Sequence, residues 1–211
     1  MLVRWVIHAC FFVEAAGARI YVDPFELPKD SGKADIILVT HGHYDHCDLK
    51  SIARIRDAST LVVLPESCAG KVSGNVRYLR AGESLRENDV TVTAVHSYNI
   101  GKPNHPKGAG LGYVIEAEGR RVYHAGDSDF IHEMTKLGEI NVALLPVGGT
   151  YTMDFLEAVE AVKAINPEVV VPMHYGRIVG SDLDALKFKQ LLDSECPEVR
   201  VEFLEGGDLV L

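Results

Sequence analysis

Short apolar runs separated by turn residues fill the first half of the chain, and this pattern is typical of β-strands. Longer segments with apolar residues at helical spacing lie between some of these runs. We therefore predict helices over residues 49–56 and 66–72. Strands are predicted over residues 3–9, 11–15, 19–22, 36–39, 61–64, 76–79 and 90–95.

The second half repeats the mixture of strands and helices. Asp154 stands as an N-cap before a run of apolar positions that recur at helical spacing until Asn166 and Pro167 stop it. Further helices are predicted over residues 129–137 and 183–192. Strands are predicted as a hairpin, 112–117 with 121–124, and over 142–146, 169–171, 199–204 and 209–211.

Both halves thus contain strands together with helices that must cover an outer face, and no linker separates the halves. Elements of this kind bury their apolar faces by packing in layers. We expect one domain over residues 1–211. Its fold class is α/β (α+β), a four-layer αββα sandwich with two mixed sheets inside and helices on both outer faces.

Composition removes several classes of protein. The 211 residues include 21 Lys and Arg and 30 Asp and Glu, a net charge of −9, which disfavours a nucleic-acid partner. The apolar runs are far shorter than the roughly 20 residues that cross a bilayer, so no membrane span is expected. The sequence gives no indication of the oligomeric state.

The first 18 residues are fairly apolar, but His8 and Glu14 interrupt them, and we interpret them as part of a hairpin that turns at Ala16-Gly17 rather than as an export signal. The four cysteines form no CxxC pair, so we expect reduced thiols and a cytoplasmic protein.

The chemistry concentrates in the string His41-Gly-His43-Tyr-Asp45-His46, which directly follows a predicted buried strand. Two histidines separated by one residue can point at one position, while Asp45 and His46 continue round the turn towards a second. Imidazole and carboxylate ligands suit zinc and tolerate iron, manganese or cobalt. Three more candidate ligands follow other predicted strands: His96, Asp127 and His174.

These residues, in this order, resemble the metallo-β-lactamase fold superfamily. The phrases DPF, YHAGDSD, ALLPVGGTYTMD and VPMHYG are similar to its UPF0173-type metal-dependent hydrolases, and the resemblance extends over almost the whole chain. It implies the αββα fold and two metal ions. His41, His43 and His96 would hold one ion, Asp45, His46 and His174 the other, and Asp127 would bridge both. His105 is the alternative to His96.

The resemblance implies a hydrolase in which a metal-bound hydroxide, made at two divalent ions about 3.5–4 Å apart, attacks the substrate. Asp45 or Asp127 would orient the hydroxide. We expect a small or medium anionic substrate: an ester, lactone, thioester or phosphodiester. Two alternatives are a metal-binding sensing domain without turnover and, less favoured by the charge, a nuclease or RNA-processing enzyme.

Several other residues have two interpretations. His8 is either a core histidine or a neighbour of the metal ligands, and His124 either orients Asp127 or packs under the hairpin. Lys102, Lys107 and Arg177 are candidate phosphate contacts. The irregular segment 97–110 is expected to determine specificity, so shortening it should change the substrate profile more than the metal content.

Overall fold

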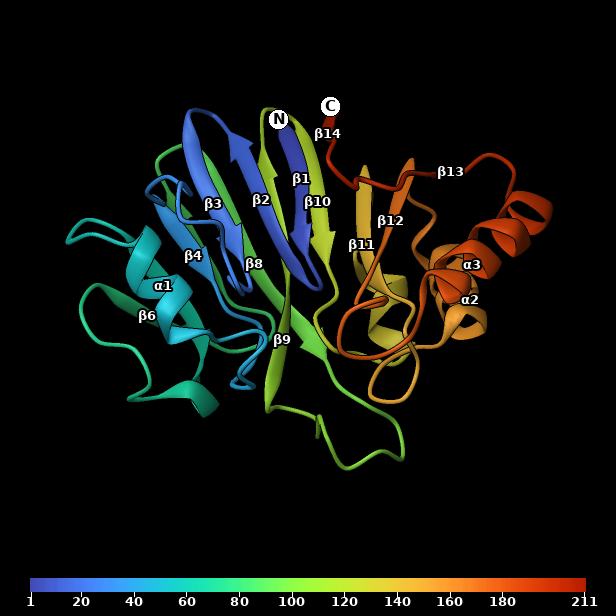
Figure 1. Ribbon diagram of the computed structural model, residues 1–211, viewed down its shortest axis with the longest axis horizontal. Coiled ribbons are helices and arrows are strands. Elements are labelled where there is room, and N and C mark those ends of the chain that lie inside the picture. Colours follow the sequence, from blue (N-terminus) through green and yellow to red (C-terminus); the bar gives the residue numbers. More distant parts are fainter.

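The computed structural model describes residues 1–211. The protein folds into two seven-stranded sheets that pack face to face (Figure 1). The first sheet has the order β14-β1-β2-β3-β4-β5-β6. Its strands are β1 (Leu2–Ile7), β2 (Cys10–Ala15), β3 (Ala18–Val22), β4 (Ile36–Leu38), β5 (Leu61–Pro65), β6 (Val76–Leu79) and β14 (Asp208–Val210).

The second sheet has the order β13-β12-β11-β10-β9-β8-β7. Its strands are β7 (Ser84–Glu87), β8 (Val90–Ser97), β9 (Gly110–Ala117), β10 (Arg120–His124), β11 (Val142–Pro146), β12 (Val169–Met173) and β13 (Arg200–Val201). Both sheets are mixed, because strands β3 to β6 and strands β10 to β13 are parallel while the remaining pairs are antiparallel.

Helices cover the outer face of each sheet (Figure 1). Helix α1 (Leu49–Ile55) packs on the first sheet, and α2 (Phe155–Ile165) and α3 (Asp182–Glu195) pack on the second. The arrangement confirms the predicted αββα sandwich. No helix is both long and apolar enough to cross a membrane.

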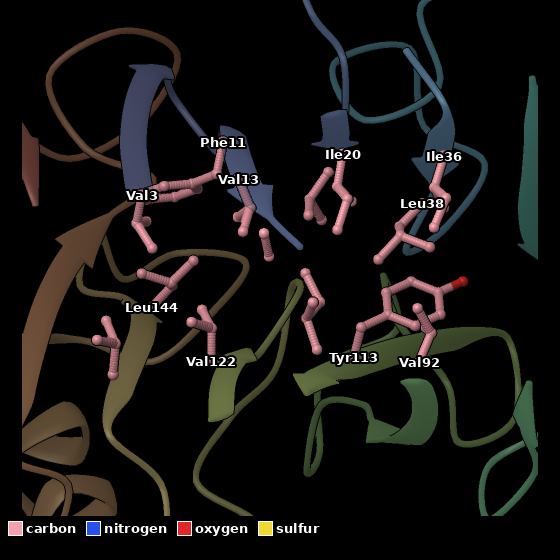
Figure 2. Close-up of a cluster of buried hydrophobic side chains, with 14 of the residues drawn as sticks. Val3, Phe11, Val13, Ile20, Ile36, Leu38, Val92, Tyr113, Val122 and Leu144 are labelled. Carbon is pink, nitrogen blue, oxygen red and sulfur yellow. The ribbon is translucent and has the colours of Figure 1, made fainter. Parts of the chain in front are cut away.

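The strands alternate between an inner and an outer core, as the period of two requires. In β4, Ile36 and Leu38 point between the sheets while Ile37 packs under α1. Figure 2 shows the inner layer, where residues of the first sheet such as Phe11 face residues of the second such as Leu144. This apolar layer fixes the two sheets relative to each other.

Helix α2 forms as its sequence predicts. The Asp154 carboxylate accepts hydrogen bonds from the N–H groups of Leu156 and Glu157, both at 2.9 Å. Asn166 ends the helix in the left-handed conformation, with φ of 51°. The predicted N-terminal hairpin is present too, with positive φ at Ala16 and Gly17.

Two predicted helices are wrong. Residues 66–72 contain only a 3-10 turn, Glu66–Cys68, because Gly70 adopts φ of +81° soon after it. Residues 129–137 likewise contain only the 3-10 turn His132–Lys136. There Asp129 does not cap a helix, since its side chain and N–H bind the segment Tyr98–Ile100. Strand β7 was not predicted because its sequence, SLRE, is polar and lies at a sheet edge.

Candidate metal centre

The candidate ligands gather where parallel strands of both sheets end. The histidine string follows β4 in the first sheet, Asp127 follows β10 and His174 follows β12 in the second. Ligand sites in α/β proteins commonly form beyond the carboxyl ends of such strands, because the loops there converge. The sandwich therefore brings residues that are more than 100 positions apart into one cluster.

The turn after β4 separates the string into two parts. The Thr40 carbonyl accepts a hydrogen bond from the Leu111 N–H at 2.8 Å, which fixes the start of the turn to the second sheet. The His43 carbonyl then accepts bonds from the N–H groups of His46 and Cys47 at 3.2 and 2.8 Å. This reversal directs His43 and His46 to different positions.

One ligand group consists of His41, His43 and His105, whose ring nitrogens lie within 4.8 Å of one another. The Nε2 atom of His41 and the Nε2 atom of His105 lie 3.0 and 3.2 Å from Nδ1 of His43. Three imidazoles in this arrangement match a common set of zinc ligands.

A second group consists of Asp45, His46, His174 and His8. Asp127 lies between the two groups. Its Oδ2 atom is 3.2 Å from Nε2 of His174 and 3.4 Å from Nε2 of His105, and its Oδ1 atom is 3.3 Å from Nε2 of His46. One carboxylate thus faces imidazoles from both groups.

Unpartnered buried atoms test whether these residues fit metal ions. Nε2 of His46, Nε2 of His174 and Oδ1 of Asp127 are all buried. None makes a hydrogen bond, because the short distances between these atoms are not matched by hydrogen-bond angles. Buried polar atoms are rarely left in this state, because an unmade bond costs about 1–3 kcal/mol. The orphaned atoms converge on one small volume, as metal ligands would, so the residues fit the metals that the sequence implies.

The pKa values within the cluster diverge. Burial lowers the pKa of His46, but the carboxylates of Asp127 and Asp23 outweigh it and hold that pKa well above its usual range. Burial, reinforced by nearby histidines, holds the pKa of His41 well below its usual range. Burial raises the pKa of Asp127, yet His174 and His46 outweigh it and hold this pKa well below the ordinary value.

Asp23 is a functional residue that the sequence reasoning missed. Its fully buried carboxylate accepts hydrogen bonds from His46 Nδ1, the Thr40 N–H and the Thr40 hydroxyl, each at 2.7 Å. The Thr40 oxygen in turn lies 3.0 Å from Nδ1 of His41, so it accepts that N–H. Asp23 therefore fixes the orientation of two candidate ligands. The available signal was the Asp23-Pro24 pair at a strand end.

The structure brings six of the seven predicted ligands together and leaves out His96. His96 lies on β8 opposite Leu111, and its ring centroid is 6.3 Å from that of Tyr98. Strand β8 ends one residue later, and the following loop returns to the site with His105. The candidate group therefore contains His105, the alternative residue, in the place that the resemblance implies for His96.

His8 and His124 have different surroundings. The His8 ring is buried beside the second group, with Nε2 3.2 Å from Oδ2 of Asp45 and its ring centroid 3.9 Å from that of His174. His124 instead donates from Nε2 to the Ala9 carbonyl and accepts the Gly126 N–H at Nδ1. His124 therefore braces the backbone before Asp127 and makes no hydrogen bond to that carboxylate.

Hydrogen bonds anchor the loop that carries His105. The Asn99 side-chain oxygen accepts the His105 Nδ1–H at 2.8 Å, and the Asn99 amide donates to Asp129 at 3.1 Å. Lys102 donates to Asp129 at 2.6 Å and to the Thr152 carbonyl at 2.9 Å. With Nδ1 of His105 engaged as a donor, its Nε2 presents a lone pair to the site.

A cavity of about 300 Å³ opens over the ligands. It is lined by His43, Tyr44, Asp45, Asn104, His105, Asp127, Tyr151, His174 and Ile178. None of these is a lysine or arginine. The three cations suggested by the sequence have carboxylate partners: Lys102 binds Asp129, Lys107 binds Glu133 and Arg177 binds Glu26.

Comparisons with known proteins agree with the site and the fold. Residues 2–174 match the family described as the beta-lactamase superfamily domain. A UPF0173 metal-dependent hydrolase of Methanopyrus kandleri is 36% identical, covering 99% of this chain and 98% of that protein. Another, from Thermoplasma volcanium, is also 36% identical and covers 89% of each chain.

Solved structures give the same result. A crystal structure of a protein from Parabacteroides distasonis superposes with a TM-score of 0.85 at 30% identity, covering 95% of this chain and 91% of that one. The metallo hydrolase Igni18 of Ignicoccus hospitalis superposes with a TM-score of 0.82 at 27% identity, covering 100% and 98%. Fold and site thus define a metallo-β-lactamase-type protein. The chain belongs to this superfamily and, within it, to the UPF0173 family of metal-dependent hydrolases.

Proposed function

We propose that the site holds two divalent metal ions and hydrolyses a small organic substrate. His41, His43 and His105 hold one ion, and Asp45, His46 and His174 hold the other. The observation that supports the proposal is the position of Asp127, whose Oδ2 atom lies close to Nε2 of both His105 and His174 while its Oδ1 atom lies close to Nε2 of His46. Imidazole and carboxylate donors favour zinc.

Two bound ions would lower the pKa of a water molecule and polarise the substrate oxygen. Protein side chains near the ions would orient the attacking water molecule and accept its proton. Burial raises the pKa of Asp45, but the hydrogen bond from His8 and the nearby His46 outweigh it, so this carboxylate stays ionised. Asp45 lines the cavity and can accept a proton from an attacking water molecule. The His8 Nε2–H holds Asp45 in position through Oδ2.

The reacting group of the substrate sits at the ligand end of the cavity. An ester, a lactone, a thioester and a phosphodiester all present an oxygen that develops negative charge there, so the ligand set alone does not choose among them. We also propose a cytoplasmic location. All four cysteines are free and buried, which supports reduced thiols.

Metal content tests the ligand assignment. Elemental analysis of protein purified without chelator should find about two ions per chain in the natural sequence and about one in His105→Ala and in His174→Ala. His96→Ala serves as the matched control and should keep about two. A loss of metal in His96→Ala, with His105→Ala unaffected, would contradict the assignment.

Activity tests the reaction. The zinc-loaded protein should hydrolyse at least one member of a panel of esters, lactones, thioesters and phosphodiesters. Asp127→Ala should lower kcat/KM at least about 100-fold, because it removes the carboxylate shared by both groups. A protein that holds two ions and hydrolyses no member of the panel would support the alternative of a metal-binding sensing domain.

A further inference from the structure

The wall of the cavity beyond the candidate ligands is apolar and aromatic. Tyr44, Tyr151 and Ile178 line it there, and 69%, 40% and 37% of their surfaces are exposed. Large apolar side chains exposed around one opening are uncommon on a soluble protein and commonly mark a binding surface. Apart from the candidate ligands and the two tyrosines, Asn104 is the one hydrogen-bonding side chain of the lining.

The charges of the cavity lining also favour an uncharged ligand. The cavity lining contains two carboxylates, Asp45 and Asp127, and no lysine or arginine. Lys102, the cation of the adjoining loop, is held by Asp129 and by the Thr152 carbonyl. A charged group entering this part of the cavity would lose hydration and find no cationic side chain to replace it.

One free ammonium group lies nearby, but in a different hollow. Lys71 has no carboxylate partner and donates to the Gly42 carbonyl at 2.6 Å. It lines a separate depression of about 240 Å³ together with His41, His43 and His105. A substrate in the main cavity would have to reach past His43 and His105 to meet it.

We propose that the natural substrate is an uncharged carboxylic ester, open or cyclic, and not the anionic substrate expected from the sequence. Its aryl or alkyl group packs against Tyr44, Tyr151 and Ile178. The proposal rests on the hydrolytic function proposed above and gives its substrate class. The reacting carbonyl lies at the ligand end, and the apolar wall binds the part of the molecule that does not react. A cavity of about 300 Å³ accommodates a small molecule of this kind.

A matched pair of esters tests the charge preference. 4-Nitrophenyl hexanoate and the 4-nitrophenyl monoester of adipic acid share a leaving group and differ in that a terminal methyl is replaced by a carboxylate. We expect kcat/KM to be at least about tenfold higher for the hexanoate. Equal rates, faster hydrolysis of the adipate, or a stronger activity on bis(4-nitrophenyl) phosphate would overturn the proposal.

A substitution at the cavity mouth tests its location. Ile178→Lys should shift the preference at least about tenfold towards the adipate, mainly through KM, because it supplies the missing cation. Leu183→Lys, on a residue that is 56% exposed on α3 and does not line the cavity, is the control with the same charge change and should leave the ratio unchanged. The same shift in both variants would overturn the assigned location.

Binding separates this proposal from the hydrolytic function. Calorimetry with two slowly hydrolysed amides, N-phenylhexanamide and the monoanilide of adipic acid, can be done on the zinc-loaded and the metal-free protein. We expect the uncharged amide to bind more tightly in both states. If neither ester is hydrolysed but this preference holds, the hydrolytic function fails and the ligand class stands. Tighter binding of the charged amide, or equal binding, would overturn the ligand class.

Discussion

Hydrogen-bond partners separate the histidines that can bind a metal from those that cannot. In His46 and His105, Nδ1 is engaged by Asp23 and by Asn99, while Nε2 faces the site. In His124 both ring nitrogens have backbone partners, so no lone pair is left for an ion. All three residues are histidines. What the two ring nitrogens bind decides whether one of them is left free to coordinate a metal ion.

Asp23 is the residue whose role is most sharply testable. Three donors converge on its carboxylate, and the amide of Asp23→Asn offers one acceptor oxygen for them. We expect zinc to bind about 10- to 100-fold more weakly, because His46 and His41 lose their fixed orientation. Competition with a chromogenic chelator measures this. Asp193→Asn, on the exposed side of α3, is the control, and equal affinity in both variants would contradict the role of Asp23.

The raised pKa of His46 predicts a proton release. The carboxylates of Asp127 and Asp23 outweigh the burial of His46 and raise its pKa, so we expect His46 to be protonated at pH 7 in the metal-free protein. A metal ion needs the neutral ring, so binding must expel the proton, and affinity should rise up to about tenfold per pH unit below that pKa.

Calorimetry at pH 7 in two buffers of different ionisation enthalpy should show about one proton released per chain from this site. The stability of the metal-free protein should change with pH in the direction opposite to the metal affinity. The stabilisation of the metal-free protein by protonated His46 is complete below the ordinary histidine pKa and is lost as pH rises through the raised value. Metal binding without proton release would contradict the assignment of His46.

At the scale of elements, the loop between β8 and β9 contributes a residue, His105, to the candidate metal centre. The prediction that shortening residues 97–110 would change the substrate profile more than the metal content goes with His96 as the ligand, which lies outside this loop, and with His105 only as its alternative. The structure places His105 of this loop among the candidate ligands and fixes it through Asn99, Asp129 and Lys102. Shortening the loop should therefore remove metal as well.

Asn99→Ala tests this link without shortening the chain. The variant removes one donor to Asp129 and the nearer acceptor of the His105 Nδ1–H, leaving only the Tyr151 carbonyl at 3.2 Å. We expect the affinity for one of the two ions to fall about tenfold while the other ion stays bound. Stepwise zinc titration resolves the two. Asn75→Ala is the control, because Asn75 only donates to the exposed Ser59 carbonyl, and identical titrations would contradict the loop's role.

The same loop shows where sequence reasoning stops. The strand before His41 and the helix after Asp154 could be predicted, because apolar spacing and an N-cap act locally. The choice between His96 and His105 depends on how a loop without periodicity folds back, which no local pattern determines. The role of Asp23 could not be predicted for a related reason. Its partners Thr40 and His46 are distant in sequence and come close to it only because β3 and β4 pair in the parallel part of the sheet.

At the scale of the whole molecule, the candidate metal centre draws its residues from both halves of the sandwich. His41 to His46 follow a strand of the first sheet, whereas Asp127 and His174 follow strands of the second. Both sheets already share the apolar layer between them. Ions bound at this edge would add a second link between the halves, so folding and metal binding should be coupled.

Removal of the metal should therefore destabilise the entire protein and not only the loops. Free zinc at about 100 times its Kd adds about 2.7 kcal/mol to the free energy of unfolding, which corresponds to roughly 5–10 °C in Tm for a chain of this size. Calorimetric scans with chelator and after zinc is restored measure the difference. Asp127→Ala should respond less to chelator than the natural sequence, because it lacks the carboxylate shared by the two ligand groups and should bind the ions more weakly. The opposite result would be a Tm of the natural sequence that does not change with chelator. It would mean that a single loop holds the metal ions, because the sandwich could then unfold without releasing them.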